Sequence, residues 1–312
     1  MARLVLYRLG GLILTLLIAS VLIYAAVYVA PGSPESFLAG GKPVSPHDLA
    51  LLKAQYHLSD PFPLAYLRWL GGVLHGNLGI SVVSKEQVTV LLGPRIATTA
   101  LLVAYATVLV LVIGIGSGVV AGLRPRLGGA IIATTSFTAA VPAFVAAVVL
   151  TWILAVELRW FPAVGDGTGF GDRLYHLTLP AVALALAVVA YVSRITRVAV
   201  REELNGSHVE TARARGLPER WIIRRHVLRN AAIPITTVVG VAFAALIGVD
   251  AVVETAFGLN GLGAYLVQSV SNKDFAVVQA ICLIFVAAFV VVNTIVDVCY
   301  GVLDPRIKAR AR

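Results

Sequence analysis

Charged residues are scarce in this 312-residue chain: Asp, Glu, Lys and Arg make up 13% of it, while 59% is hydrophobic. Soluble domains are only about 45–50% apolar and about 25% charged. Cysteine is also scarce, because Cys282 and Cys299 are the only two and they share one apolar run. No CxxC motif is present, which excludes a disulfide framework and a thiol metal or redox motif. The composition therefore indicates a membrane protein.

Catalytic and nucleotide-binding motifs are missing as well. No G-x-x-x-x-G-K-[ST] loop occurs, since Gly40-Gly41-Lys42 is followed by Pro43. Neither H-E-x-x-H nor G-x-S-x-G is found, although Ser117 lies between two glycines. The six histidines fall outside the interiors of the apolar runs and form no ligand cluster. We therefore expect no catalytic residue, no metal site and no cofactor in this chain.

Long apolar runs are what the chain has in abundance. A run of about 20 apolar residues is enough to cross the hydrocarbon layer as a helix. We predict an all-α, polytopic membrane protein with six transmembrane helices, at residues 9–30, 96–122, 130–156, 178–200, 233–256 and 277–302. We expect residues 1–95 to hold the first helix and a long extracytoplasmic segment. Residues 96–312 would form a five-helix core.

The first run, Leu9 to Ala30, is longer than the apolar stretch of a signal peptide, which covers roughly 7–15 residues. We therefore interpret it as a retained helix. The gap that follows, about 32–95, contains no spanning run. It predicts a short amphipathic helix at 46–57 and a second helical segment within 61–80, where Tyr66 and Trp69 suit a membrane interface.

The distribution of basic residues predicts the orientation. An even number of spans places both termini on one side, and 17 of the 25 Lys and Arg residues would lie on that side. Positive residues favour the cytoplasm, so we expect cytoplasmic termini and a cytoplasmic 201–232 loop in a bacterial inner membrane. The net charge of +9 is explained by this topology and does not require a nucleic-acid partner.

The second span carries Gly114, Gly118 and Gly122 at intervals of four residues. Small residues at this spacing let two membrane helices approach closely. The spacing predicts tight helix packing at this place, without indicating which helix is the partner.

The 201–232 loop is much longer than a simple connection requires. Ser207 and Glu210 fit the S-x-x-E capping box, in which Ser207 would accept from the third amide and Glu210 would reach back. Gly216 stands where a left-handed residue would end the helix, and Pro218 prevents its continuation. The loop thus predicts a short helix with defined ends at about 207–217. A second helical stretch would run from Pro218 to Pro234.

The segment Glu210-Thr211-Ala212-x-x-x-Gly216 resembles the E-A-A-x-x-x-G loop of ABC importer permeases. The resemblance implies that this is the coupling helix, which docks into the ATPase subunit and transmits its movement. The residues at that interface would be Ser207, Glu210, Thr211, Ala212, Arg213, Arg215 and Gly216. Thr211 departs from the family's alanine, and the distance from Gly216 to Ile233-Pro234 is longer than the general pattern.

Further pieces in family order extend the resemblance over nearly the whole chain, among them Leu58-Ser59-Asp60-Pro61, Val141-Pro142-Ala143-Phe144 and Tyr300-Gly301-x-Leu303-Asp304-Pro305-Arg306. They are similar to the first (B-type) permease of dipeptide and oligopeptide importers. The resemblance implies a type I importer permease fold. It also implies a second homologous permease, two ABC ATPase subunits or one fused ATPase that bind ATP and Mg, and an extracytoplasmic substrate-binding protein.

Asp250 and Glu254 lie four residues apart near the outer end of the fifth span, so they share a helix face. Acidic residues within spans usually face a cavity or mark a functional site. Asp250, and less directly Glu254, could therefore meet the ammonium end of a peptide in the substrate path. The alternative is that both are hydrated at the membrane interface.

Other functions stay open at this point. Within the ABC permease class, the cargo could be a nickel chelate, glutathione, haem or another small solute instead of a peptide. An ion-coupled secondary transporter is a second class, with Asp250 and Asp297 as its only acidic candidates. An intramembrane protease is a third, and it lacks a histidine base within a span.

Overall fold

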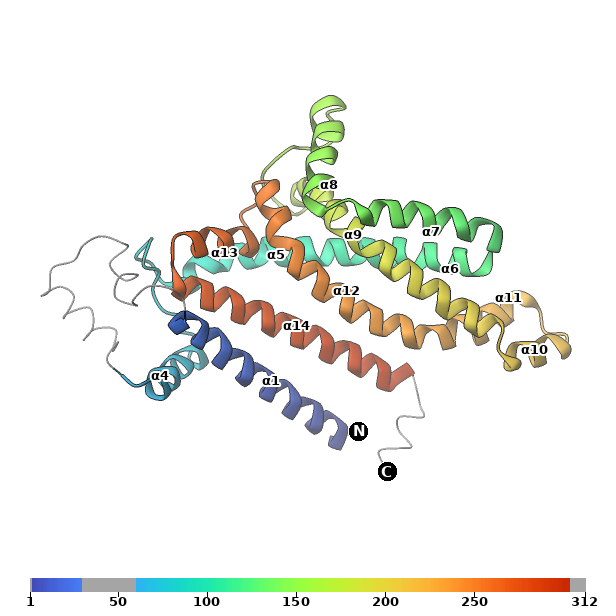
Figure 1. Cartoon of the computed structure of the whole chain (residues 1–312), viewed down its shortest axis with the longest axis horizontal. Helices are drawn as coiled ribbons and strands as arrows, with labels where there is room; N and C mark the ends of the chain where they lie inside the picture. Colours follow the sequence, from blue (N-terminus) through green and yellow to red (C-terminus); the bar gives the residue numbers. More distant parts are fainter. Residues whose placement is uncertain (1, 30–59, 304–312) are drawn as a thin grey trace, which may run out of the picture. The chain divides into compact units, whose positions relative to one another are not determined.

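The computed structural model describes residues 2–29 and 60–303 (Figure 1). Within these ranges the chain forms helices and no strand, and one isolated bridge pairs Ile80 with Gln87. The predicted all-α fold is confirmed. The helix predicted at 46–57 lies outside the described residues.

The chain divides into two compact units, each interrupted in sequence. The described residues of the first are 99–259 and 292–303, and those of the second are 2–29, 60–98 and 260–291. Helices α5 (Val88–Leu109) and α14 (Phe275–Leu303) each have one end in either unit. The first unit otherwise holds α6 (Gly116–Leu123), α7 (Pro125–Ala140), α8 (Ala143–Leu150), α9 (Phe170–Leu204), α10 (Ser207–Ala214), α11 (Glu219–Ile222) and α12 (Leu228–Ala256). The second holds α1 (Ala2–Val29), α4 (Phe62–Leu74) and α13 (Leu262–Ser271).

Four continuous helical stretches are long and apolar enough to cross a membrane. They are Val88–Leu123, Phe170–Leu204, Glu219–Ala256 and Phe275–Val296. α7 and α8 together would make a fifth span if they are counted as one, and Gly10–Ala26 is a shorter apolar helix. The described residues thus confirm several membrane helices, and the count of six stays a prediction.

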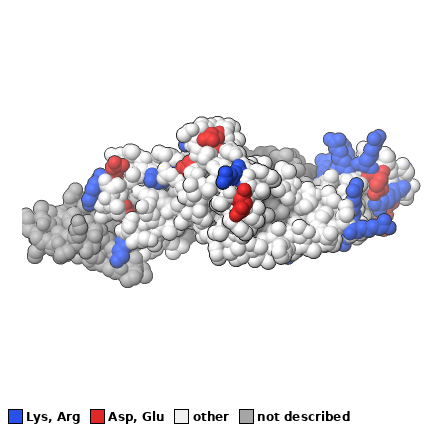
Figure 2. All heavy atoms as spheres, turned by 90° about the horizontal axis from the view of Figure 1, so that it is seen from above, with Lys and Arg blue, Asp and Glu red and all other residues white. Residues whose placement is uncertain are grey.

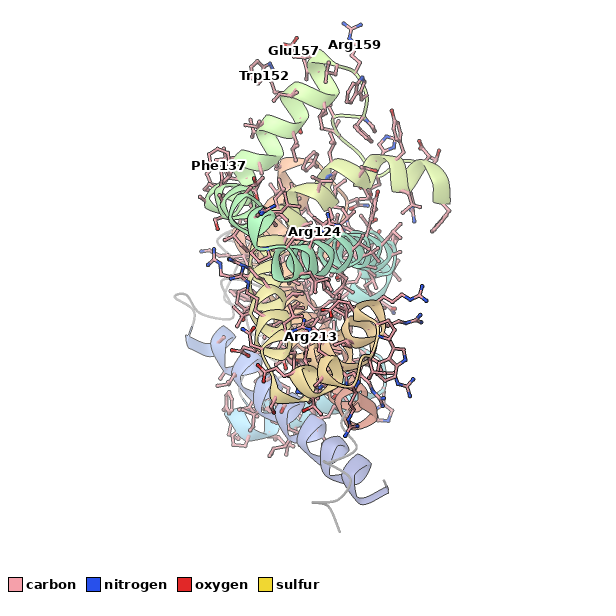
Figure 3. The ribbon with its side chains drawn as sticks, turned by 90° about the vertical axis from the view of Figure 1, so that its right-hand side faces the viewer. Arg124, Phe137, Trp152, Glu157, Arg159 and Arg213 are labelled. Atoms are coloured by element: carbon pink, nitrogen blue, oxygen red, sulfur yellow. The ribbon has the colours of Figure 1, made fainter. Side chains whose placement is uncertain are left out.

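The third predicted span, 130–156, is not one straight helix. α7 ends at Ala140, and the chain bends by 95° before α8 and the π-helical segment Thr151–Glu157 continue. Val141 is extended (φ −82°, ψ 119°) because the ring of the following Pro142 disfavours the helical conformation there. Phe137, 75% exposed, and Trp152, 58% exposed, point away from the ribbon (Figure 3).

Helix α9 is the centre of the first unit. It runs beside α12 (Figure 1) and packs against α6, α7 and α8. The glycine spacing in the second span meets this helix: a Cβ on Gly118 would lie 2.5 Å from the carbonyl oxygen of Ser193, and one on Gly122 would lie 2.7 Å from Val200. The predicted tight packing is confirmed, and α9 is the partner.

The helical stretch that begins after Pro218 does not end at Pro234. α11 continues through a π-helical segment, Ile223–Val227, directly into α12, and Pro234 stands inside that helix. Proline is tolerated in membrane helices because neighbouring groups satisfy the carbonyl that it leaves free. The fifth span is therefore continuous with the 201–232 loop.

The second unit contains α4, which confirms the helix expected within 61–80. Tyr24 of α1 contacts the rings of Phe62, Tyr66 and Trp69 of α4. The Tyr66 hydroxyl also lies 2.9 Å from Ser20 Oγ. Aromatic side chains with a polar edge are enriched where membrane meets water, which suits this cluster.

Candidate functional site

The short helix predicted in the loop exists as α10, but its first residue is held differently. The N-cap is Gly206, not Ser207, and no side chain caps the helix. The capping-box prediction for Ser207 and Glu210 is therefore wrong. The helix begins one residue earlier because Gly206, extended at φ −72° and ψ 143°, takes the N-cap position, where glycine is among the preferred residues. Glu210 instead lies in the first turn, where a negative charge is favourable.

The other end of α10 is as predicted. Gly216 has φ +73°, a left-handed conformation that glycine adopts without steric cost. The amide of Leu217 donates to the Ala212 carbonyl at 3.3 Å, and the amide of Gly216 donates to the Arg213 carbonyl at 2.9 Å. These two bonds form a Schellman motif. Pro218 then serves as the N-cap of α11, so the helix end is sharply defined.

One side of α10 is fixed to the rest of the first unit. Val209 and Ala212 are buried in a cluster with Ala199 and Val200 of α9, Ile222 of α11 and Ala231 of α12. Ala212 therefore holds the helix in place instead of facing outward. The remaining predicted interface residues, Ser207, Glu210, Thr211, Arg213, Arg215 and Gly216, are exposed.

The two arginines of this helix end differ in their partners. The Arg213 guanidinium donates twice to the Glu219 carboxylate, from Nη2 at 2.7 Å and from Nε at 3.2 Å. The hydrogen bond to Glu219 raises the pKa of Arg213 further above its ordinary value. Arg215 forms no ion pair with any other described residue. Of the two, Arg215 is the cation that remains available to a partner.

Basic side chains gather at the end of the first unit that carries α10 and α11 (Figure 2). Those exposed there include Arg215, Arg220, Arg224, Arg225 and Arg229. Arg213 lies on the same end (Figure 3). A surface of this kind attracts acidic groups on a protein or anionic lipid headgroups.

A polar cluster beside α10 escaped the sequence analysis. The Glu203 carboxylate at the end of α9 lies 3.2 Å from His208 Nε2 of α10 and accepts from Asn230 Nδ2 of α12, also at 3.2 Å. The imidazole of His226 lies next to that of His208, with ring centroids 6.2 Å apart. Glu203 and His208 are five residues apart in sequence, but Asn230 follows Glu203 by 27 residues, so only the loop's return brings it to them.

The acidic pair in α12 lies in a different environment. Asp250 and Glu254 are both 0% exposed. Thr99 of α5 donates its hydroxyl proton to Glu254. No donor among the described residues meets the geometric criteria for a hydrogen bond to Asp250, and its carboxyl lies beside that of Glu254. The two acids do share a helix face, as expected, but hydration at the interface is not what surrounds them.

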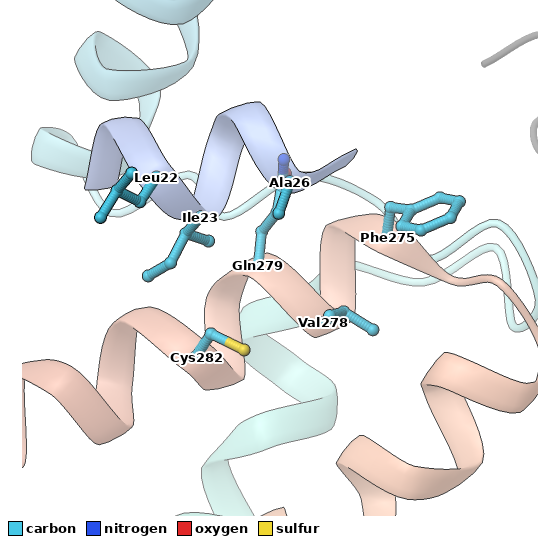
Figure 4. Close-up of a pocket in the computed structure, with 7 residues that line it drawn as sticks. All are labelled: Leu22, Ile23, Ala26, Phe275, Val278, Gln279 and Cys282. Carbon is cyan, nitrogen blue, oxygen red and sulfur yellow. The ribbon is translucent and has the colours of Figure 1, made fainter. Parts of the chain in front are cut away.

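A groove in the second unit lies between α1 and the first turns of α14 (Figure 4). Its volume is about 390 Å³, and it is formed by Leu22 and Ile23 of α1 and by Phe275, Val278 and Cys282 of α14. Gln279 is the one residue in its lining with an amide side chain. Such an apolar groove suits acyl chains and offers no charged group for a hydrophilic cargo.

Comparison with protein families gives two matches. Residues 110–309 match the family described as "Binding-protein-dependent transport system inner membrane component". Residues 1–103 match the N-terminal family of the same transport-system membrane components. Together the two matches cover almost the whole chain.

Several relatives are similar over their full length. The glutathione transport system permease protein GsiC of Salmonella paratyphi A is 36% identical over 312 residues, which is 99% of each chain. GsiC of Escherichia coli K12 is 34% identical over 310 residues, again 99% of each. A Brucella ovis protein named as a peptide permease is 33% identical over 304 residues, covering 94% of this chain and 95% of the relative.

Among solved structures, the MetNI methionine ABC transporter in an inward-facing conformation is similar in fold. The TM-score is 0.58 at 19% identity, and the match covers 69% of this chain and 96% of the other. At this identity the likeness concerns the fold alone.

Proposed function

The chain belongs to the family of binding-protein-dependent transport system inner membrane components, the permeases of ABC importers, and we propose that its cargo is small peptides, including glutathione. The cargo proposal rests on full-length similarity to permeases named for glutathione and for peptides. Glutathione and small peptides are both short, charged, hydrophilic molecules with peptide bonds. One set of polar side chains along the translocation pathway could therefore serve either cargo.

We propose further that α10 is the element that meets the ATPase. The observation that carries this role is its construction: one side is buried against α9 and α12, and the other presents exposed polar residues next to a left-handed glycine. Because one side of α10 is packed against the permease, a force that the ATPase applies to its exposed side would move the helix without rotating it about its own axis. Thr211, Glu210 and Arg215 would then touch the ATPase, while Ala212 holds the helix in its seat.

This role implies an orientation. α10 and the basic surface around it would lie in the cytoplasm, where the ATPases and ATP are found, and the termini would lie on the same side. ATP binding would bring the coupling helices of this chain and of a second homologous permease together, and hydrolysis would release them. An extracytoplasmic binding protein would deliver the peptide. The permease itself would catalyse no reaction.

A place for Asp250 in the substrate path is a separate proposal. Because the carboxyl is fully buried, a peptide ammonium would reach it only after α12 moves relative to its neighbours. That this buried carboxyl has only the acid Glu254 beside it, and no geometric hydrogen bond from a described donor, supports a role in another conformational state. Unchanged peptide uptake by Asp250→Asn would remove this proposal.

The test of the proposed function is purification of the tagged chain from its native membrane in mild detergent. We expect a second permease and ABC ATPases to accompany it, and ATP-dependent uptake of glutathione or dipeptides after reconstitution with the binding protein. A chain that purifies alone, with uptake abolished by a protonophore at normal ATP, would instead favour an ion-coupled transporter. A complex that hydrolyses ATP but does not transport peptides would support the role as an ABC permease and contradict the proposed peptide cargo.

A further inference from the structure

Three helices of the first unit meet at one carboxylate. Glu203 stands in the last turn of α9, His208 in the first turn of α10 and Asn230 in the first turn of α12. His208 Nε2 and Asn230 Nδ2 both lie 3.2 Å from the same oxygen, Glu203 Oε2. We call these three residues the loop joint.

The position of Glu203 is unfavourable for helix α9 by itself. The carbonyl groups at a helix C-terminus carry partial negative charge, so a carboxylate there is repelled. The Asn230 amide of α12 donates to this carboxylate, and His208 of α10 lies at ion-pair distance from it. Both contacts offset the repulsion, because a charge-assisted hydrogen bond is stronger than a neutral one. Glu203 therefore stabilises the contact of α9 with α10 and α12 more than it stabilises α9 itself.

The imidazole of His208 lies within reach of both partners. Its Nε2 is 3.2 Å from Glu203 Oε2 and 3.5 Å from Asn230 Nδ2. With a proton on Nε2 the ring pairs with the carboxylate, and with Nε2 unprotonated it accepts from the Asn230 amide. In either form a polar contact links α10 to α12, beside the apolar contacts of Val209 and Ala212.

The imidazole of His208 is confined on two sides. Gly206 leaves it room, since a Cβ there would lie 2.6 Å from Cε1 and 2.7 Å from Nδ1. The ring of His226 lies on another side, and Trp221 contacts that ring in turn with centroids 5.0 Å apart. Gly206 has φ −72°, which any residue adopts, so the reason for glycine is the imidazole and not the backbone.

An eight-residue helix is too short to hold its own orientation in water. We propose that the loop joint is the connection through which a movement of α10 reaches α9 and α12, so that Glu203, His208 and Asn230 are positioning residues for transport. This inference rests on the proposed docking of α10 to an ATPase. The buried contacts of Val209 and Ala212 resist compression, whereas the directional bonds of the joint resist tilting and sliding.

The experiment follows movement at the far end of α12. Thr255, exposed and about 38 Å along the helix from Asn230, is replaced by Cys in a chain whose Cys282 and Cys299 are Ser. A fluorophore on it reports, in the complete complex in lipid, the response to a non-hydrolysable ATP analogue. We expect Asn230→Ala and His208→Phe each to reduce the response about fivefold, the scale of losing one ordinary hydrogen bond, with ATPase subunits still bound in normal ratio.

Residues next to the loop joint in the sequence provide matched control substitutions. Glu202→Gln and Asn205→Ala alter neighbours outside the loop joint and should leave the response unchanged. His208→Gln keeps a donor and should retain most of it. Gly206→Ala should behave like His208→Phe, because its methyl group displaces the imidazole while the backbone stays unstrained.

The outcomes separate the inference from the proposed function. Full response in both joint variants would overturn the inference, and so would loss of the ATPases from those variants, since the joint would then only shape the docking surface. If the unmodified reporter chain binds no ATPase or shows no response, the proposed function fails first and the inference fails with it.

Discussion

The two ends of α12 carry polar residues in opposite circumstances. At its first turn, Asn230 is exposed and takes part in a hydrogen-bonded group that extends to α9 and α10. Near its last turn, Asp250 and Glu254 are completely buried, with Thr99 donating to Glu254. Helix α12 thus carries a solvent-accessible polar residue at its first turn and a solvent-inaccessible acidic pair near its last turn.

The difference indicates two kinds of task. Exposed polar groups cost little to solvate, so residues near α10 can exchange partners when another protein binds. Buried carboxyl groups are expensive unless they are hydrogen-bonded, so their surroundings must stay fixed in each stable state. We therefore expect substitutions on the exposed face of α10 to change assembly and those at the acidic end of α12 to change stability.

The largest expected effect is on assembly, through Gly216→Val. A β-branched residue with φ +73° costs about 1–3 kcal/mol of backbone strain, so the helix end reorganises. We expect association with the ATPases to weaken about ten- to a hundredfold. Quantitative co-purification over a range of ATPase concentrations measures this.

Gly129→Val is the control, because a Cβ there meets nothing within 4 Å and no left-handed conformation is involved. Normal ATPase binding by Gly216→Val would contradict the docking role of this helix end. A loss of thermal stability equal to that of core variants would mean that the residue serves folding instead.

The second effect is on stability, through Glu254→Ala. The substitution removes a buried side chain together with its hydrogen bond from the Thr99 hydroxyl. We expect a loss of roughly 2–4 kcal/mol, seen as a lower unfolding temperature of the detergent-purified chain. Glu254→Gln keeps an acceptor oxygen and should lose less. Equal losses in the two variants would show that the contact with Thr99 contributes nothing.

The third prediction concerns the close contact between α6 and α9. Gly118→Ala places a methyl group 2.5 Å from the Ser193 carbonyl and from Thr196 Cβ, which forces α6 and α9 apart. We expect a loss of about 1–3 kcal/mol from overpacking. Gly116→Ala, two residues away, meets nothing within 4 Å and should be neutral in the same unfolding assay. A similar effect of both would contradict the tight packing.

The smallest effect separates the two arginines of α10. Arg213 is already paired with Glu219, whereas Arg215 has no ionic partner among the described residues. We expect Arg215→Gln to slow ATPase association on the order of threefold at low salt, as an interface charge does, and Arg213→Gln to slow it less. Association rates by surface plasmon resonance at two salt concentrations would check the order. The reverse order would show that Glu219 releases Arg213 on docking.

Much of the fold was accessible from the sequence because its signals are local. The apolar runs predicted the membrane helices, and the spacing of Gly114, Gly118 and Gly122 predicted the close packing of the second span against another helix. The bend at Pro142 was not accessible, since Pro94, Pro180 and Pro234 stand inside continuous helices. Whether a proline breaks a membrane helix depends on what its neighbours supply, and the sequence does not show that.

The candidate site divides in the same way. The end of α10 at Gly216 follows from one residue and its conformational freedom, so the sequence predicted it. Its beginning at Gly206, one residue before the expected cap Ser207, was not predicted, because glycine and serine are both acceptable N-cap residues and the local pattern favoured serine. The loop joint depends on Glu203 and Asn230, 27 residues apart, meeting in space. No spacing rule covers such a contact.

The central claim, that α10 meets the ATPase, is tested most directly by site-specific cross-linking. Thr211→Cys, exposed on α10, would carry a short photoreactive group in the complex within native membranes, with Thr255→Cys at the other end of α12 as its match. We predict that Thr211→Cys forms an adduct with the ATPase whose yield changes on ATP binding, and that Thr255→Cys forms none. Adducts of Thr211→Cys with lipid alone, or equal ATPase adducts from both positions, would contradict the claim.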